Sequence, residues 1–178
     1  MMRHDPLANP RPLIRRVYSY VAYRLGEGHD AEDVTNDVFE RALRYRSSYD
    51  ESRGAPLPWL LGIARHCVDD ARSVRRARAE VELDRLETPS AEDVSGRVVE
   101  RIALAAAIER LDDRDRDLVA LRYGADLTAR QIGELLGLKQ NAVEVALHRA
   151  LARLRGDLGG GGAASARSAR DPAAGTSP

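Results

Sequence analysis

The chain has 178 residues, with 28 basic and 28 acidic side chains, and therefore no formal net charge. Its one cysteine, Cys67, has no partner for a disulfide, and no apolar run approaches the roughly 20 residues that cross a bilayer. No signal peptide is recognisable, so we expect a cytoplasmic protein without membrane insertion. A chain of this length can form one domain or two small ones.

Charge is unevenly spread along the chain. Residues 65–78 carry five arginines against two aspartates, and residues 139–155 carry four basic side chains against one glutamate. Between these segments, residues 80–93 hold six acidic side chains and one arginine. Two basic segments separated by an acidic one indicate two surfaces for a polyanion, joined by a linker that does not bind it.

Apolar residues recur at helical spacing and alternating strand patterns are almost absent, which predicts an all-α fold. The first helix is expected to begin after the prolines of residues 10–12 and to end at Gly26. Asp30 is placed to cap a second helix that has a buried apolar stripe and an acidic exposed face. Residues 49–58 contain a glycine and two prolines and are expected to form a loop, with Pro58 in the first turn of a third helix.

The order of these segments predicts two small helical domains joined by a flexible linker. The first module spans residues 10–79, and residues 80–95 form the acidic linker. The second module spans residues 96–156 and contains a helix-turn-helix. Residues 157–178 are rich in Gly, Ala and Ser and are expected to form a disordered tail.

Residues 128–150 follow the pattern of that helix-turn-helix. Thr128 can cap the first helix, with Gln131 as its partner in a capping box. Gly137 can adopt the positive φ that ends this helix, and Leu138 can then pack between the two helices.

The second helix of the motif exposes side chains that can reach the major groove and the flanking phosphates. These are Lys139, Gln140, Asn141, Glu144, Val145, His148 and Arg149. A polar, solvated face on an ordinary helical hairpin is the alternative interpretation. The glycine turn, the spacing and the basic segment that follows together favour DNA binding.

Two further stretches of the chain carry recognisable motifs. The first is AEDVTNDVFERALR (residues 31–44), followed by YDESRG (49–54) and PWLLGIAR (58–65). The second is LDDRDRDLVALRY (111–123), followed by the helix-turn-helix and LHRALARLR (147–155). Both stretches, in this order, resemble the extracytoplasmic-function (group IV) sigma factors of bacterial RNA polymerase. A helix-turn-helix alone is weak evidence for this family, whereas the paired modules are strong evidence.

The resemblance implies that the first module binds the β′ clamp coiled coil of core RNA polymerase and opens the minus-ten element of promoter DNA. The second module would read the minus-thirty-five element and contact the β flap. The implied polymerase-binding face consists of Asp33, Asn36, Asp37 and Glu40. A solvated acidic face is the alternative for these residues. An anti-sigma factor that holds the two modules together would silence such a protein.

Strand opening requires a pocket for a flipped base and cations along the exposed strand. The resemblance gives these roles to Tyr49, Asp50, Arg53, Arg65, His66, Arg72, Arg75 and Arg76. For Tyr49, an aromatic side chain that caps the core is an equally good interpretation.

Three positions depart from the family pattern. His66 stands where many relatives carry asparagine, so base recognition in the pocket is expected to differ. Glu144 and Ala146 occupy positions that are commonly basic in the recognition helix. A carboxylate near phosphates weakens binding, but glutamate can accept a hydrogen bond from cytosine, so we expect an unusual minus-thirty-five preference.

Other classes of function compete with this one. A stand-alone, dimeric helix-turn-helix regulator would need a dimerisation surface, and none is recognisable. A sigma-like adaptor that holds an anti-sigma protein without initiating transcription is the second alternative. An enzyme is the least supported, because neither Asp69 with Asp70 nor His66 with Cys67 has further metal ligands at a recognisable spacing. We therefore expect no catalytic residues, no cofactor and no metal.

Overall fold

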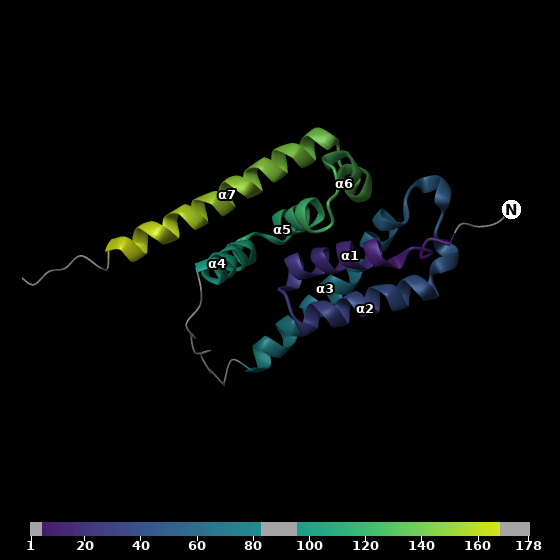
Figure 1. The fold of residues 1–178 in the computed structure, drawn as a ribbon, viewed down its shortest axis with the longest axis horizontal. Helices are drawn as coiled ribbons and strands as arrows, with labels where there is room; N and C mark the ends of the chain where they lie inside the picture. The colour runs from purple at the N-terminus through teal and green to yellow at the C-terminus, as the bar shows by residue number, and fades with distance from the viewer. Residues whose placement is uncertain (1–4, 83–95, 168–178) are drawn as a thin grey trace, which may run out of the picture.

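The structure is a computed structural model that describes residues 5–82 and 96–167. Every regular element in these residues is helical, which confirms the expected fold class (Figure 1). The elements of the first module are α1 (Pro10–Leu25), α2 (His29–Arg44), the 3₁₀ turns η1 (Arg46–Ser48) and η2 (Glu51–Arg53), and α3 (Pro56–Glu82). Those of the second are α4 (Gly96–Arg110), α5 (Asp113–Val119), the π-helical turn η3 (Ala120–Gly124), α6 (Ala129–Leu136) and α7 (Gln140–Arg167).

The apolar faces of α1, α2 and α3 meet in one core. Val17 and Val21 of α1, Val38 of α2, and Leu60 and Leu61 of α3 are all fully buried. Burial of one such side chain contributes about 1.5–3 kcal/mol. The shared core therefore holds the first module together. None of the described helices is long and apolar enough to span a membrane.

The ends of the first two helices follow the positions of proline and glycine. α1 has Pro10 in its first turn and ends before Gly26, whose φ of 92° suits glycine. The expected cap of α2 is wrong, because Gly28 precedes the helix and no side chain caps it. Asp30 lies in the first turn instead, where its negative charge interacts favourably with the helix dipole.

α3 starts earlier and ends later than the sequence predicts. It begins at Pro56, so Pro58 lies in its first turn and the preceding loop is shorter than residues 49–58. It continues through the arginine-rich segment to Glu82, and residues 80–82 are helical although they were expected to belong to the linker. Residues 83–95 lie outside the described part of the chain.

The second module is organised by a short polar corner between α4 and α5. Asp112 caps α5 by accepting a hydrogen bond from the backbone nitrogen of Asp115 at 2.8 Å. Arg116 donates to the carbonyl oxygens of Ile108 at 3.1 Å and Leu111 at 3.0 Å, which lie at the end of α4. These bonds satisfy backbone groups that helix ends leave without partners. The buried side chains of this module's own cluster are Ala107, Ile108, Leu111, Val119, Ala150 and Leu154.

The last helix is longer than expected. α7 continues to Arg167, so residues 157–167, placed by the sequence in a disordered tail, are helical in the structure. No proline interrupts the chain between the start of α7 and this point. Residues 168–178 lie outside the described part of the chain.

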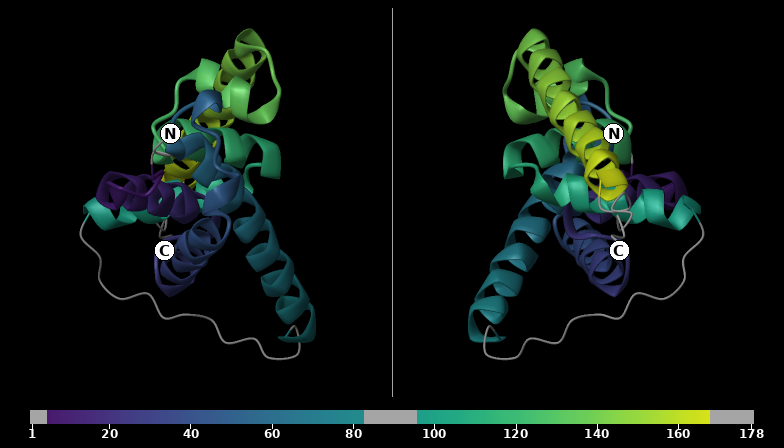
Figure 2. Two further views of the ribbon diagram at one scale, coloured as in Figure 1. Left: turned by 90° about the vertical axis from the view of Figure 1, so that its right-hand side faces the viewer. Right: turned by 90° about the vertical axis from the view of Figure 1, so that its left-hand side faces the viewer.

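The two modules pack directly against each other, an arrangement that the sequence left open. α1 lies beside α5 and η3, as Figure 1 shows and the turned views of Figure 2 confirm. Val17 and Tyr20 of α1 belong to the same buried apolar cluster as Leu118 of α5 and Leu121 of η3. One hydrophobic core thus runs from the first module into the second.

Candidate nucleic-acid interface

The helix-turn-helix has the geometry that its sequence predicts. The Thr128 side chain accepts a hydrogen bond from the Gln131 backbone at 3.2 Å, and Gln131 Oε1 accepts one from the Thr128 backbone at 2.9 Å. Gly137 ends α6 with a φ of 68°, in the left-handed region. The backbone nitrogen of Leu138 then donates to the carbonyl of Gly133 at 2.8 Å, which tightens the turn. The capping box and the glycine turn are both confirmed.

The turn between α6 and α7 depends on a close backbone contact at Gly133. A Cβ atom at this position would lie 2.6 Å from the carbonyl oxygen of Leu138. No side chain fits in that space, so the sharp angle between the two helices requires glycine here. This angle determines how the start of α7 is presented.

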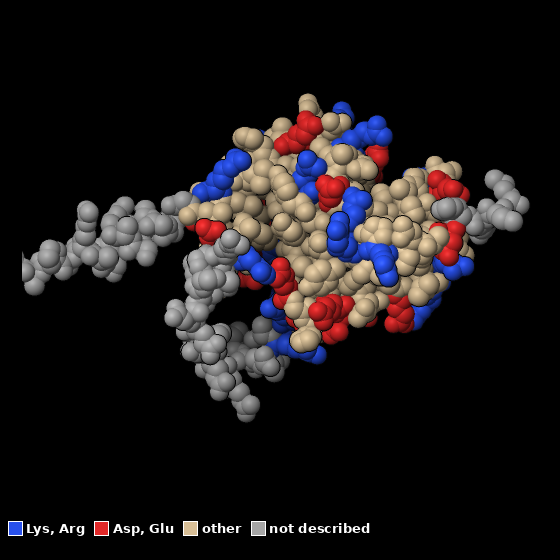
Figure 3. Space-filling view, viewed as in Figure 1, with Lys and Arg blue, Asp and Glu red and all other residues tan. Residues whose placement is uncertain are grey.

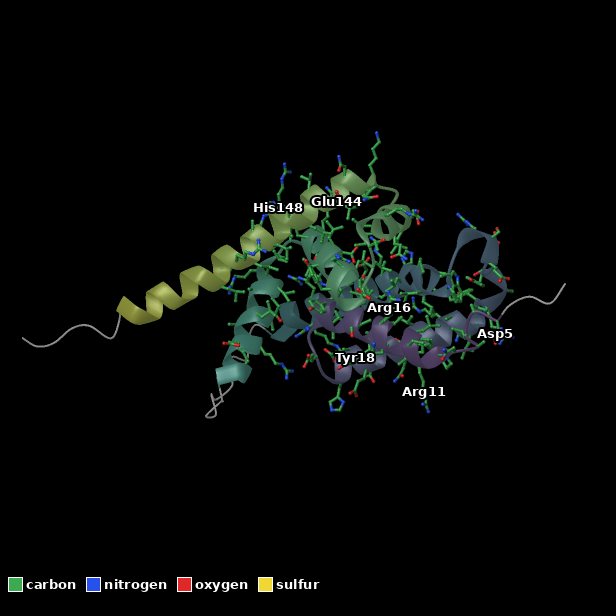
Figure 4. The ribbon with its side chains drawn as sticks, turned by 45° about the horizontal axis from the view of Figure 1, so that its top comes forward. Asp5, Arg11, Arg16, Tyr18, Glu144 and His148 are labelled. Atoms are coloured by element: carbon green, nitrogen blue, oxygen red, sulfur yellow. The ribbon has the colours of Figure 1, made fainter. Side chains whose placement is uncertain are left out.

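The start of α7 presents the expected recognition face to solvent. The exposed residues are Lys139, Gln140, Asn141, Glu144, Val145, His148 and Arg149. The opposite side is anchored by buried Val143 and Leu147. In Figure 4, Glu144 and His148 lie on the side of the molecule away from Tyr18 and Arg11 of α1. Gln140 Nε2 donates to Glu144 Oε1 at 2.8 Å, so these two side chains are coupled one turn apart.

The loop before α3 is organised by Asp50 and Tyr49. The Asp50 carboxylate accepts hydrogen bonds from the backbone nitrogen of Ser52 at 3.0 Å and from its hydroxyl at 2.7 Å. These bonds lower the pKa of Asp50, because they favour the charged carboxylate. Tyr49 donates its hydroxyl to the carbonyl of Gly54 at 2.8 Å, and its ring centroid lies 5.5 Å from that of Trp59.

The tilted pair of Tyr49 and Trp59 forms an aromatic platform at the start of α3. The ring planes meet at 57°, a common arrangement for interacting aromatics. Both side chains are half-buried, and Trp59 also packs against the hydrophobic core. His66 is exposed two helical turns after Trp59, on the same side of α3. The platform and Asp50 thus lie at the start of α3, and His66 lies about two turns further along the same side of the helix.

Three arginines of α3 have polar partners in the structure. Arg65 Nε donates to Asp117 Oδ2 at 3.0 Å, and Arg72 pairs with Asp113. Arg75 donates to the carbonyl of Leu25 at 3.1 Å. Arg75 and Arg76 of α3 are exposed, as is Arg53 in η2. On the face of the molecule shown in Figure 3, basic and acidic side chains are interspersed.

The carboxylates that pair with these arginines come from the second module and are not predicted by the sequence. Asp113 and Asp117 lie on α5, and Asp117 is only 7% exposed. The acidic spacing of residues 111–117 is visible in the sequence, but no local pattern connects it to residues 65–72.

The acidic face of α2 is open to solvent. Asp33, Asn36, Asp37 and Glu40 are all exposed, on the side opposite to buried Val34 and Val38. Glu40 pairs with Arg44 at 2.7 Å within the helix. Within the residues that the structure describes, no group of three or more His, Cys, Asp or Glu side chains is placed to hold a metal ion. These four residues thus form an exposed and predominantly acidic surface on α2.

Two family models match the chain, one for each module. A model described as Sigma-70 region 2 matches residues 11–79, and a model described as Sigma-70, region 4 matches residues 101–154. Among solved structures, the sigma factor RpoE in complex with the anti-sigma factor NepR from Bartonella quintana has a TM-score of 0.61 at 17% identity. That likeness covers 82% of this chain and 91% of RpoE, and at this identity it concerns the fold.

Curated relatives match over most of this chain. It is 34% identical over 149 residues to the ECF RNA polymerase sigma factor BldN of Streptomyces coelicolor, covering 79% of this chain and 56% of BldN. It therefore spans little more than half the length of that relative. It is 33% identical over 163 residues to the ECF RNA polymerase sigma factor ShbA of Streptomyces griseus, covering 85% of each chain. The chain belongs to the ECF family of RNA polymerase sigma factors.

Proposed function

We propose that this protein directs core RNA polymerase to a set of promoters through two DNA-reading surfaces in one chain. The observation that carries the proposal is the presence, in one chain, of two structures with complementary tasks. One is a capped helix-turn-helix with an exposed recognition face. The other is an arginine-rich helix that begins beside an aromatic platform.

In this proposal, the start of α7 reads the minus-thirty-five element from the major groove. The platform of Tyr49 and Trp59, together with Asp50 and His66, receives a base that leaves the duplex at the minus-ten element. Arginine side chains then follow the phosphates of the exposed strand. These are Arg53, Arg65, Arg72, Arg75 and Arg76.

The acidic face of α2 is proposed to bind the clamp coiled coil of the polymerase β′ subunit, and the second module to contact the β flap. Two weak DNA sites in one chain bind together when the polymerase fixes their separation. Catalysis then belongs to the polymerase, and the protein acts in the cytoplasm. An anti-sigma factor is a further proposed partner.

The test is run-off transcription with purified core polymerase on a fragmented genomic library, with and without the protein. We expect new start sites that share two spaced upstream elements. An Asp37→Lys variant should lose these starts, because it reverses a charge on the proposed polymerase-binding face. A Glu100→Lys variant makes the same charge change at an exposed residue of α4 and serves as the control.

If the protein binds core polymerase but no new starts appear, a non-initiating adaptor replaces the sigma function. Specific binding to a DNA site without core polymerase would instead support a stand-alone regulator.

A further inference from the structure

A pocket where α1, α3, α4 and α5 meet is lined mainly by arginines. Its volume is about 350 Å³, within the range of roughly 300–1,000 Å³ that small-molecule pockets span. Leu25 and Glu109 form part of the lining. The arginines of this pocket, called the arginine pocket below, are Arg24 of α1, Arg72, Arg75 and Arg76 of α3, and Arg116 of α5. Within the residues that the structure describes, five basic side chains thus line the pocket with one acidic side chain.

Contacts inside the protein compensate only part of this positive charge. Arg75 donates to the backbone carbonyl oxygen of Leu25 at 3.1 Å, and Arg116 donates to carbonyl oxygens at the end of α4. Carbonyl groups are neutral, so these hydrogen bonds leave both positive charges in place. The ion pairs of the described residues reach only Arg24 and Arg72 among the five arginines.

The most buried of the five side chains also has an unsatisfied donor. Arg24 is 6% exposed, and its Nε has no hydrogen-bond partner among the described residues. Asp69 lies 3.4 Å from its Nη2 and Asp117 lies 4.0 Å from its Nε, which are long distances for an ion pair. A buried donor without an acceptor is unfavourable, so an acceptor oxygen that reaches Nε would stabilise this arrangement.

The guanidinium groups of the pocket also repel one another. Burial lowers the pKa of Arg116, and the positive charges of Arg72 and Arg24 lower it further, while Asp113 and Glu109 raise it. An anion with more than one negative charge would relieve this repulsion. Guanidinium groups bind phosphate through paired N–H donors, so phosphate is the chemical group that suits the pocket best.

An apolar groove continues from the arginine pocket between α1 and α4. The two hollows share Arg24, Glu109 and Arg116, so one ligand can occupy both. The volume of the groove is about 470 Å³. Its lining includes two tyrosines and three aliphatic side chains, which are Tyr18, Tyr23, Ile102, Leu104 and Ile108. Tyrosine rings provide surfaces on which a nucleotide base can stack.

We propose that the arginine pocket and the apolar groove together bind a nucleoside diphosphate, with the diphosphate among the arginines and the base in the groove. A diphosphate concentrates several negative charges in a compact group, and the attached base supplies a flat apolar surface. Neither Arg24, Arg116 nor the groove has a part in the proposed reading of promoter DNA, so this site lies beyond that function.

The first part of the test addresses the charge of the arginine pocket. Isothermal titration calorimetry measures the binding of ADP and of inorganic pyrophosphate to the full-length protein, because both modules contribute to the lining. Arg75→Ala and Arg76→Ala remove exposed positive charges, and Glu109→Gln removes the acidic side chain of the lining. The matched controls are Arg78→Ala on α3 and Glu100→Gln on α4, at exposed residues outside both linings.

We expect both ligands to bind at one site per chain, and Arg75→Ala and Arg76→Ala to weaken both by about tenfold. Glu109→Gln should tighten both by about threefold, because it removes a repulsive charge. The two controls should match the wild type. Absence of binding, or equal affinity in all these variants, would overturn the site, because the anion would then not distinguish this pocket from the rest of the basic surface.

The second part of the test separates a nucleotide from a free diphosphate. Ile102→Ala removes apolar surface from the groove, and Val74→Ala makes a similar change at an exposed residue of α3 outside it. We expect ADP to bind more tightly than pyrophosphate, and Ile102→Ala to weaken ADP alone by about threefold. Val74→Ala should leave both affinities unchanged. If pyrophosphate binds as tightly as ADP in the wild type, the assignment of a nucleotide is wrong and the pocket holds an inorganic anion only.

Discussion

Glu144 lies in the middle of the exposed face of α7, where its carboxylate accepts a hydrogen bond from Gln140. In the proposed function this carboxylate faces the major groove, where it can accept a hydrogen bond from cytosine N4 and repels nearby phosphates. The residue should therefore contribute more to the choice of sequence than to affinity.

We predict that Glu144→Arg changes which minus-thirty-five sequence is preferred, by about 1–3 kcal/mol of discrimination at the contacted position. The measurement is the frequency of each base at that position among promoters selected from a randomised library by the holoenzyme. Glu134→Arg, which makes the same change of charge at an exposed residue of α6, should leave the frequencies as in the wild type. If both promoter choice and affinity stay unchanged in Glu144→Arg, the proposed role of this residue is wrong.

The pKa of Tyr20 depends on how the two modules pack together. Burial raises its pKa well above the ordinary value of a phenol, and the Asp117 carboxylate raises it further, while Arg24 and Arg65 lower it. Because the pKa in the folded state is raised, the stability that this group contributes is present below its ordinary pKa. That stability is lost as the pH rises toward the folded-state pKa.

We predict that one of the six tyrosines ionises only at alkaline pH values at which the modules also separate. Absorbance at 295 nm follows ionisation of the phenol, and scattering measured on the same samples follows the separation. In Tyr20→Phe the late absorbance step should be missing, whereas Tyr18→Phe should retain it. A late step that persists without Tyr20 would contradict this assignment.

The turn between α6 and α7 leaves no space for a side chain at Gly133. A methyl group at Gly133 would meet a carbonyl oxygen at 2.6 Å, whereas a methyl group at Gly156 in α7 meets nothing within 4 Å. We predict that Gly133→Ala destabilises the protein by about 1–3 kcal/mol. Gly156→Ala should stabilise it by about 0.5–1 kcal/mol, because alanine is the better helix former. Thermal unfolding followed by circular dichroism measures both, and equal effects of the two changes would contradict the account of the turn.

The helix ends show which features can be predicted from residues that are close together in the sequence. The capping box of Thr128 and Gln131 and the turn at Gly137 are predicted from the sequence, because each connects residues only a few positions apart. The predicted N-cap of α2 is wrong, because both Asp30 and Gly28 are residue types that fit the start of a helix. Which of them caps the helix depends on the backbone conformation of the turn, which the sequence does not show. The recognition face of α7 is confirmed as exposed, while its contacts with DNA stay a prediction.

The pairing of Arg65 with Asp117 lies beyond any local pattern. These residues are 52 positions apart, and the linker between their modules does not indicate how the modules meet. The DNA-binding roles that the family resemblance implies for Arg65 and Arg72 stay predictions, and the structure shows in addition that both side chains pair with carboxylates of the second module. Such a double use becomes visible only when the two modules are seen packed together.

At the scale of the whole molecule, the two modules share one buried cluster that extends from α1 into α5 and η3. The buried cluster and the ion pairs of Asp113 and Asp117 oppose separation of the two modules. In the proposed function two elements of one promoter are read at once, and any separation of the modules that this requires must be driven by binding to the polymerase.

The most direct test of the central claim is transcription from one promoter recovered with core polymerase, in which the two upstream elements are replaced one at a time. Replacement of either element should abolish the transcript made with the wild-type protein. With Glu144→Arg, a changed minus-thirty-five sequence should restore transcription, while the minus-ten requirement stays the same. Transcription that survives the replacement of both elements would contradict the account, because the protein would then not read promoter DNA through two surfaces.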